Sequence, residues 1–479
     1  MNRKTIINNL SKIVMVEVLL MIPPMLISFA YGEIKDALSF LMVILPILVI
    51  SYILGKVVKG DKLGPRDGYV IVASAWIIIS LIGAVPLFLS GAFNSYIGAF
   101  FEIVSGFTTT GASVMADPGV LGHGMQFFRC FSHWVGGMGV LVFVLMIMPL
   151  ENDSSMHLVR AEVPGPTAGK IVPKMSQTSR ILYGIYAGIT LLLVIILIIL
   201  GMPIYDAFCY AFGTAGTGGF SITAAGISAY NSPAIEIVIS IFMLACGVNF
   251  NVYYLILMGK AKDALKTEEL KVYLGIVISS VLIVGVNIYK TIGNVFDTFR
   301  LSLFQVSSII TTTGFATADY SVWPQLSQHL LVFLMIIGGC AGSTAGGMKV
   351  SRVIILWKSF LAEIRSVMNP KQVISVRVNS EVVSQRTLQS SRIYAAAYLI
   401  IICISTLLLS ANGFDFTTNV TAVLACFNNI GPGLNLVGPA ANFGIYNDFS
   451  KFILAIVMLT GRLEIFPMFL LFAKSAHEK

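Results

Sequence analysis

Charged side chains are scarce in this sequence. Of its 479 residues, only 11% are Asp, Glu, Lys or Arg and 56% are hydrophobic, whereas soluble globular proteins carry about 25% charged residues. So few charges cannot cover a surface that faces water. This shortage excludes a soluble enzyme, a nucleic-acid-binding protein and a disordered chain, and it predicts a protein that lies largely in a membrane.

Cysteine pairs are also lacking. The six cysteines are spread through apolar stretches and form no C-x-x-C motif, so neither a disulfide framework nor a zinc site is expected. They are better interpreted as small buried apolar side chains. The apolar run after Lys12 is long, contains Pro23 and Pro24, and is soon followed by another run. We therefore predict retained membrane structure there, not a cleaved signal peptide.

Long apolar runs dominate what is present. A helix needs about 20 apolar residues to cross a bilayer, and unpaired backbone cannot cross lipid. The runs therefore predict an all-α polytopic membrane protein. We predict ten spans, at residues 13–30, 37–54, 69–91, 127–150, 181–202, 234–258, 273–290, 330–357, 391–410 and 452–474.

Basic residues indicate the orientation. They gather in alternate links, around residues 56–66, 160–180, 260–271 and 349–392. The opposite links contain a single Lys or Arg, Arg300, together with acids such as Glu102 and Asp117. By the positive-inside rule the basic links are cytoplasmic, and both termini then lie in the cytoplasm.

The four weakly polar outer links resemble one another. Each begins with an apolar stretch of about ten residues, too short to span a bilayer, and then reaches a run centred on glycine. The central glycines are 95 to 117 residues apart, at Gly111, Gly219, Gly314 and Gly431. Such a period predicts a repeated unit of span, half-helix, glycine loop and span. The expected divisions are an N-terminal helix pair at 1–67 and four pore repeats at 68–150, 151–271, 272–378 and 379–479.

These glycine loops suit a cation pathway. Irregular backbone at membrane depth is tolerated where protein buries it or where it lines a water-filled path. A ring of carbonyl oxygens can replace the hydration shell of a monovalent cation. One Thr/Gly run between two spans is usually only a turn, but four at corresponding positions favour a selectivity filter. The acids of the outer links would raise the local cation concentration at the mouth.

The loops resemble those of the superfamily of K⁺ transporters that contains TrkH, TrkG, KtrB, fungal Trk and plant HKT proteins. The resemblance extends from about residue 68 to 474, and the two extra N-terminal spans favour the TrkH/TrkG branch. It implies that four pore loops of one chain surround one pore, with one filter glycine in each loop. It also implies that K⁺ contacts carbonyls beside those glycines, at Thr109, Thr110, Thr217, Gly218, Thr312, Thr313, Asn429 and Ile430.

Two loops depart from a uniform pattern. In the second, either Gly218 or Gly219 can be the filter glycine, and the match of Phe220 to Phe315 favours Gly219. The fourth carries Asn-Asn-Ile where the first and third carry Thr-Thr-Thr, so fourfold symmetry is only approximate and selectivity can be looser than in a K⁺ channel. In the plant branch a serine in the first loop accompanies Na⁺ preference, so Gly111 favours K⁺.

The eighth span is interrupted by a glycine-rich segment. Each glycine costs a helix about 1 kcal/mol relative to alanine, so the helix should break here. The resemblance implies an intramembrane gate loop below the filter, made by Gly338, Gly339, Gly342, Ser343, Thr344, Gly346, Gly347 and Lys349. Close helix packing through small residues is the alternative. A nucleotide-binding loop is not expected, because no soluble strand precedes the segment.

Two ionisable residues within predicted spans need an explanation, since intramembrane charges are costly. Arg462 lies in the last span, and the resemblance implies that it faces the pore beneath the filter, repels cations and pairs with the gate loop. Its alternative is a structural pair with Glu464, or snorkelling. Glu17 in the first span is interpreted as a helix-packing partner.

Taken together, these features predict K⁺ uptake through a channel-like pore of the bacterial inner membrane. An enzyme is not expected, since Ser132 and Ser343 lie in no G-x-S-x-G motif. The alternatives are a symporter that couples K⁺ to H⁺ or Na⁺ and a non-conducting receptor or assembly subunit. The resemblance further implies a homodimer and a cytoplasmic, nucleotide-binding subunit like TrkA, with K⁺ as cargo, membrane lipids around the chain, no organic cofactor and no nucleic acid.

Overall fold

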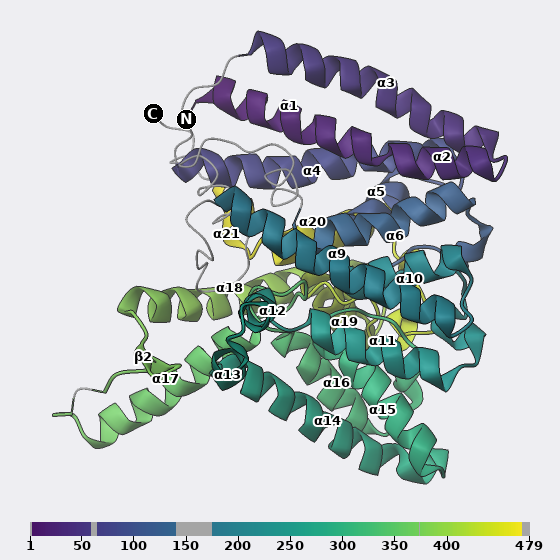
Figure 1. The fold of residues 1–479 in the computed structure, drawn as a ribbon. Helices are drawn as coiled ribbons and strands as arrows, with labels where there is room; N and C mark the ends of the chain where they lie inside the picture. The colour runs from purple at the N-terminus through teal and green to yellow at the C-terminus, as the bar shows by residue number, and fades with distance from the viewer. Residues whose placement is uncertain (1, 59–64, 140–174, 373, 472–479) are drawn as a thin grey trace.

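The computed structural model describes residues 2–58, 65–139, 175–372 and 374–471. Within them the chain is helical apart from a small antiparallel hairpin of β1 (Arg377–Val378) and β2 (Glu381–Val382). Six of the described helices are long and apolar enough to cross a membrane, and a bent pair of helices adds a seventh candidate. The protein is an all-α polytopic membrane protein (Figure 1).

The helices fall into an N-terminal group and four successive groups. The N-terminal group is α1 (Arg3–Leu20), α2 (Ile22–Ala30) and α3 (Ile34–Val57). The next two groups are α4 (Pro65–Leu89), α5 (Tyr96–Phe107) and α6 (His123–Gly137), then α9 (Met175–Ile199), α10 (Ile204–Gly216), α11 (Pro233–Cys246), α12 (Phe250–Leu257) and α13 (Ala261–Lys266). The last two are α14 (Glu268–Ile292), α15 (Val295–Ile310), α16 (Gln325–Ile337) and α17 (Val350–Met368), then α18 (Gln385–Leu409), α19 (Phe416–Phe427), α20 (Asp448–Arg462) and α21 (Phe466–Leu470).

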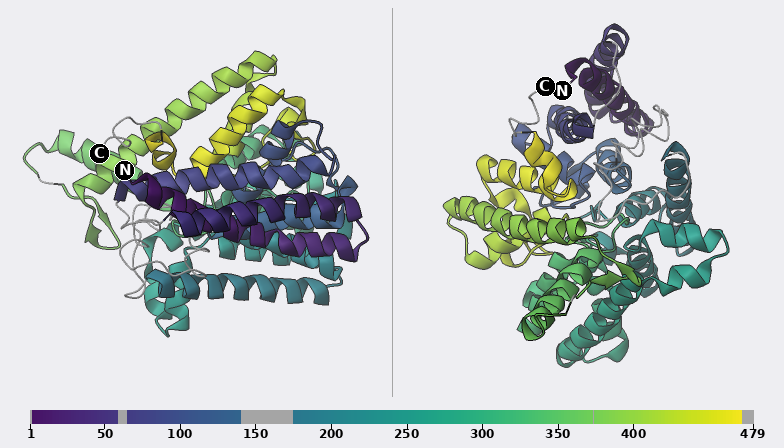
Figure 2. Two further views of the ribbon diagram at one scale, coloured as in Figure 1. Left: turned by 90° about the horizontal axis from the view of Figure 1, so that it is seen from above. Right: turned by 90° about the vertical axis from the view of Figure 1, so that its left-hand side faces the viewer.

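The four groups surround the centre of the molecule in chain order. In the right-hand view of Figure 2 the colours pass around the centre from blue through teal and green to yellow, and the purple N-terminal helices lie outside this ring. Helix α1 packs on α3 and α4, so the N-terminal group leans against the first group. α17 and the hairpin extend away from the helical body at the lower left of Figure 1.

Each of the four groups contains a half-length helix that comes directly before its glycine loop. α5, α10, α15 and α19 have 12, 13, 16 and 12 residues, as the apolar half-length segments predicted. Three of them begin at residues whose side chains accept a backbone hydrogen bond, Ser95, Asn294 and Asp415, which satisfies amide groups that the helix leaves unpaired. The C-terminal halves of all four helices are buried, so the part of each helix next to its glycine loop is enclosed by protein.

The predicted continuous spans were wrong in two further places. A break was expected only in the eighth span, yet α11 and α12 meet at 91°, and α20 ends at Arg462 before the separate α21. Gly247 lies at the first break, where a Cβ atom would be 2.7 Å from the Tyr273 hydroxyl. At the second break, Glu464 and Ile465 have φ values of 57° and 69°. In the predicted fourth span, 127–150, the described helix α6 ends at Gly137. Residues 140–150 of that span lie outside the described residues.

The outward faces of the long helices are apolar. Val286 of α14 is 79% exposed and Leu407 of α18 is 72% exposed, whereas polar side chains such as Thr109 and Glu102 are fully buried. This distribution is typical of a protein surrounded by lipid, where apolar side chains on the outer faces of the helices do not contact water.

Candidate ion pathway

The loops that follow the four half-helices share one backbone conformation. In each loop the residue two before the central glycine is left-handed, with φ of 55° or 56°, at Thr109, Thr217, Thr312 and Asn429. The amide of the following residue then donates to the carbonyl five residues back, for example Thr110 N to Ser105 O at 2.8 Å and Ile430 N to Ala425 O at 2.9 Å. This is a helix-terminating motif that turns the chain out of the helix axis.

The four predicted filter glycines are equivalent in conformation. Gly111, Gly219, Gly314 and Gly431 have φ values of 77°, 79°, 82° and 100°, a region that side chains other than glycine rarely adopt. Gly218 does not have positive φ. In the second loop, Gly219 is therefore the residue that corresponds to the glycines of the other three loops.

Each of these glycines packs against the backbone of the next loop. A Cβ atom would lie 2.0 Å from Gly218 O if placed on Gly111, 2.0 Å from Thr313 O on Gly219, and 1.7 Å from Ile430 O on Gly314. On Gly431 it would lie 2.8 Å from Thr110 O, which returns to the first loop. The four loops therefore form a closed ring in chain order, and the carbonyl beside each glycine occupies the space that a side chain would need.

The threonines beside the ring support it from behind. The Thr108 hydroxyl donates to Val104 O at 2.7 Å, and its oxygen lies 2.8 Å from the Thr110 hydroxyl. Thr311 repeats this arrangement in the third loop, 2.6 Å from Ser307 O and 2.8 Å from the Thr313 hydroxyl. In each Thr-Thr-Thr run, these bonds join the first threonine to its own half-helix and to the third threonine.

The fourth loop uses asparagines for the same purpose. Nδ2 of Asn428 donates to Leu424 O at 2.9 Å, as the Thr108 hydroxyl does to Val104 O in the first loop. Nδ2 of Asn429 donates to the Thr110 hydroxyl at 3.0 Å and to Met458 O at 3.1 Å. The departure from Thr-Thr-Thr thus adds a side-chain link between the fourth loop and the first.

A buried histidine joins the first two groups. The Phe220 amide donates to Nε2 of His133 at 3.2 Å, so Nδ1 carries the proton and donates to Gly106 O at 2.8 Å. His133 is therefore a neutral link between α5 and the second loop. In the sequence, His133 is only a polar side chain within an apolar run, which does not indicate this link.

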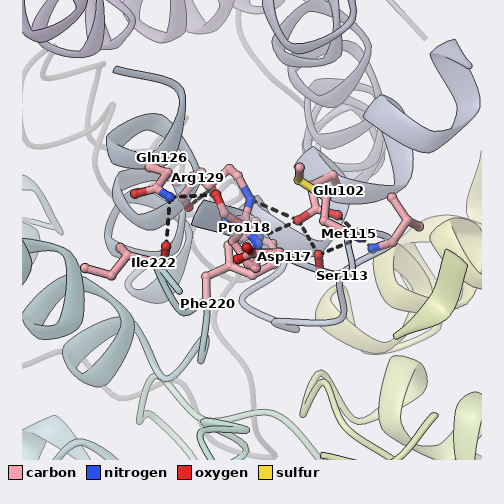
Figure 3. Close-up of polar contacts among 12 residues, drawn as sticks. Glu102, Ser113, Met115, Asp117, Pro118, Gln126, Arg129, Phe220 and Ile222 are labelled. Carbon is pink, nitrogen blue, oxygen red and sulfur yellow. Dashed lines mark hydrogen bonds and ion pairs between the residues drawn. The ribbon is translucent and has the colours of Figure 1, made fainter. Parts of the chain in front are cut away.

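A buried ion pair supports the first loop next to the residues that follow Gly111 (Figure 3). The Arg129 guanidinium donates to Oε1 of Glu102 at 2.9 and 2.6 Å, and neither side chain is more than 1% exposed. Glu102 also accepts from the Ser113 hydroxyl at 2.9 Å and the Val114 amide at 3.0 Å. The expectation that Glu102 attracts cations at the mouth is wrong for this residue, because its carboxylate is enclosed and paired.

Arg129 was not singled out from the sequence. Its guanidinium also lies 4.1 Å from the ring centre of Phe220 in the second loop. A charged residue inside a predicted span indicates a functional or structural role. Arg129, however, is the third residue of the predicted span 127–150, and a charge so close to the end of a span is common.

The glycine-rich segment between α16 and α17 is a loop closed at its base. Backbone bonds join Met348 N to Ile336 O at 3.1 Å, Lys349 N to Ile337 O at 2.9 Å, and Val350 N to Gly339 O at 3.0 Å. At the neck, Gly338 and Gly347 have φ values of 72° and 78°, and a Cβ atom on Gly347 would lie 2.7 Å from the Cα atom of Gly338. The helix is therefore broken here, as the glycines predicted. The two sides of the loop also pack closely through glycines at its neck.

The body of this loop touches the break between α11 and α12. Cys340 N donates to Gly247 O at 2.9 Å, Phe250 N donates to Gly342 O at 3.0 Å, and the Thr344 hydroxyl donates to Cys246 O at 3.2 Å. The Gly346 amide donates to the Thr312 hydroxyl at 2.6 Å. The residues predicted as a gate therefore lie directly against the ring.

Arg462 binds backbone carbonyls from two other groups. Its Nη1 donates to Thr344 O at 3.0 Å, and its Nη2 donates to Gly136 O at 2.5 Å and to Gly137 O at 2.7 Å. Glu464, the alternative partner, is paired with Arg352 instead. Arg462 thus joins the gate-loop segment to the end of α6.

The other charges near this loop have fixed partners. The Lys349 ammonium donates to Ala345 O within the loop. The Arg352 guanidinium lies 4.1 Å from the ring centre of Tyr394.

Glu17 is 1% exposed, and neither of its carboxyl oxygens has a hydrogen-bond partner among the described residues. Glu17 lies in α1, which packs on α3 and α4, and its interpretation as a helix-packing residue stays a prediction.

The oxygen atoms of the ring come from the backbone, and the ring contains no acidic side chain. The described residues contain no group of three His, Cys, Asp or Glu side chains that could hold a metal ion. The ring itself presents neutral backbone oxygens, which match a weakly held monovalent cation. The Arg462 guanidinium and the Lys349 ammonium donate to carbonyls of the glycine-rich loop between α16 and α17.

Comparison with known proteins agrees with this geometry. Residues 41–282 and 270–479 match the model of a family described as "TrkH: Cation transport protein". The chain is 34% identical over 465 residues to the Trk system potassium uptake protein TrkG of Escherichia coli, covering 95% of this chain and 94% of that protein. It is 36% identical to TrkH of Salmonella typhimurium, with 86% of each chain covered. The crystal structure of the potassium transporter TrkH from Vibrio parahaemolyticus superposes with a TM-score of 0.89 at 30% identity, with all of both chains covered. The chain belongs to the TrkH family of cation transport proteins.

Proposed function

We propose that this protein takes up K⁺ through a channel-like pore whose selectivity filter is the ring of four loops. The observation that carries the proposal is the packing of each central glycine against a carbonyl of the next loop, which closes the ring without a charged side chain. Related proteins of similar length are named potassium uptake proteins. A ring of carbonyls provides oxygen ligands in place of water for a dehydrated K⁺ ion.

In this proposal the gate is the loop from Gly338 to Gly347. It lies against the ring and is held by hydrogen bonds and not by a packed helix. Arg462 supplies positive charge beside the path and fastens the loop to α6. Conduction then requires the loop to leave the path, and the charge of Arg462 raises the barrier while the loop is in place.

The setting of the pore is part of the proposal. We place the chain in the bacterial inner membrane with its basic links and both termini in the cytoplasm, on the strength of the charge bias. The basic face would receive a cytoplasmic nucleotide-binding subunit resembling TrkA. A homodimer with one pore in each protomer is proposed from the family resemblance.

The test is ion uptake by liposomes that hold the purified protein. Rb⁺ and Na⁺ uptake is measured with and without a membrane potential, and with and without a pH gradient. Rb⁺ entry down its own gradient, with little Na⁺ entry, supports the channel-like pore. Rb⁺ entry that requires a proton or sodium gradient supports a coupled symporter instead, and absence of uptake, with and without the cytoplasmic subunit, contradicts both.

A further inference from the structure

The third filter loop differs from the other three because its left-handed residue forms a hydrogen bond with the gate loop. The left-handed residue of this loop, Thr312, accepts a hydrogen bond from the Gly346 amide at 2.6 Å. Both residues are buried. The bond therefore joins the ring to the gate loop in a place that excludes water, where an unmade hydrogen bond is costly.

The equivalent side chains in the other loops do not contact the gate loop through a hydrogen bond. The Thr217 hydroxyl donates to the neighbouring Gly216 O at 2.6 Å. Asn429 bonds to the first loop and to α20. The Thr109 hydroxyl is buried and has no hydrogen-bond partner among the described residues.

Gly346 is also packed against the ring. A Cβ atom on Gly346 would lie 2.2 Å from Asn428 O in the fourth loop. Movement of the gate loop would therefore remove the donor from Thr312 and uncover a carbonyl of the fourth loop in the same step. Two elements that share buried contacts of this kind cannot change independently, and the coupling between them acts in both directions.

We propose that Thr312 is a positioning residue that couples the filter to the gate, because its hydroxyl holds the gate loop closed through the Gly346 amide. This inference rests on the proposed pore and gate. Thr312 acts here through its side chain, whereas its carbonyl belongs to the ring. The closed position is stabilised by a hydrogen bond that the open position lacks.

The experiment compares Rb⁺ uptake by liposomes containing Thr312→Val, Thr312→Ser and Thr109→Val. Valine has the shape of threonine without the hydroxyl, and serine keeps the hydroxyl. Thr109→Val removes an equivalent hydroxyl that is not bonded to the gate loop, so it reports the effect of that change on the ring alone. We expect Thr312→Val to raise uptake about three- to tenfold above Thr109→Val, as the loss of one buried hydrogen bond implies, and Thr312→Ser to restore the lower rate.

A second comparison uses a variant that lacks residues 341–346 and so has no Gly346 amide. In that background we expect Thr312→Val and Thr109→Val to have equal effects, which is the non-additivity that a direct interaction requires. Equal uptake by Thr312→Val and Thr312→Ser in the full-length loop would overturn the inference. The inference would also be overturned if, in the variant that lacks residues 341–346, Thr312→Val still gave higher Rb⁺ uptake than Thr109→Val. Failure of the proposed function looks different, because the unmodified protein would then show no Rb⁺ uptake down its own gradient.

Discussion

The carboxylate of Glu269, in the first turn of α14, accepts a hydrogen bond from the Ala341 amide of the gate loop at 2.8 Å. It also accepts from the Ser351 amide in the first turn of α17 at 3.1 Å. Glu269 is 8% exposed. One acidic side chain at the beginning of α14 thus holds both the gate loop and the helix that follows it.

We expect Glu269→Ala to loosen the gate loop and raise Rb⁺ uptake. Hydrogen bonds to a charged group contribute about 1.5–3 kcal/mol each, so an increase of about tenfold is expected if part of that stabilises the closed loop. Glu268→Ala is the matched control, because the neighbouring Glu268 contacts Lys358 and the Asn379 amide and not the gate loop. Equal uptake by the two variants would contradict the assignment.

Arg462→Ala should raise Rb⁺ conduction, since it removes a positive charge and three hydrogen bonds to backbone carbonyls. Arg462→Lys should have an intermediate effect, because an ammonium keeps the charge but cannot reproduce the planar fork. Uptake per reconstituted protein is the measurement. A lower yield of folded protein with unchanged uptake would show that the role of Arg462 is structural.

Gly314→Ala should abolish ion uptake. The added Cβ atom would lie 1.7 Å from Ile430 O, so the ring must open or the chain must misfold, at a cost of about 1–3 kcal/mol or more. We expect Rb⁺ uptake to fall at least tenfold. Gly184→Ala in α9 is the control, because nothing lies within 4 Å of its added Cβ atom, and normal uptake by Gly314→Ala would show that the ring has room that the structure lacks.

Glu102→Gln should destabilise the protein strongly. Removal of one partner from a buried ion pair leaves the other charge uncompensated and costs about 3–5 kcal/mol, here at Arg129. Thermal unfolding in detergent measures the loss. Glu363→Gln is the control, since its contact with Arg392 is 3.9 Å long and exposed, and such pairs contribute only about 0–1 kcal/mol. Similar melting temperatures for the two variants would refute the role of the buried pair.

The thermal stability of the protein should fall in acid as Glu33 becomes protonated. Burial by itself raises the pKa of Glu33, but hydrogen bonds from the His123 side chain and from the His123 and Gly124 amides outweigh it and lower this pKa below its ordinary value. A lowered carboxyl pKa contributes stability that is complete above the unfolded value and is lost as pH falls through the folded value. The melting temperature should therefore drop below about pH 5, by no more than about 2 °C, because water still reaches this partly exposed carboxylate. Glu33→Gln should lose that part of the pH dependence and lower the melting temperature near neutral pH, and an unchanged acid profile would contradict this account.

The sequence alone determined the fold class and the type of element that each segment forms. Apolar runs can satisfy their backbone groups in lipid only as helices, so the helical membrane class followed from composition. The half-helices α5, α10, α15 and α19 were also predictable, because each apolar stretch is too short to cross a bilayer and is followed by a glycine loop. The break before α17 followed from its many glycines.

The tertiary structure decided which residues meet. Local sequence has no signal for a carbonyl that lies where the Cβ atom of Gly111 would be, or for the partners of Thr312 and Glu269, because these contacts join segments far apart in the chain. The breaks after α11 and α20 were missed for the same reason: packing and hydrogen bonds from other groups hold a left-handed or bent backbone that local propensity does not favour. Burial of the Glu102–Arg129 pair likewise depends on α5 and α6 lying side by side within a protein core.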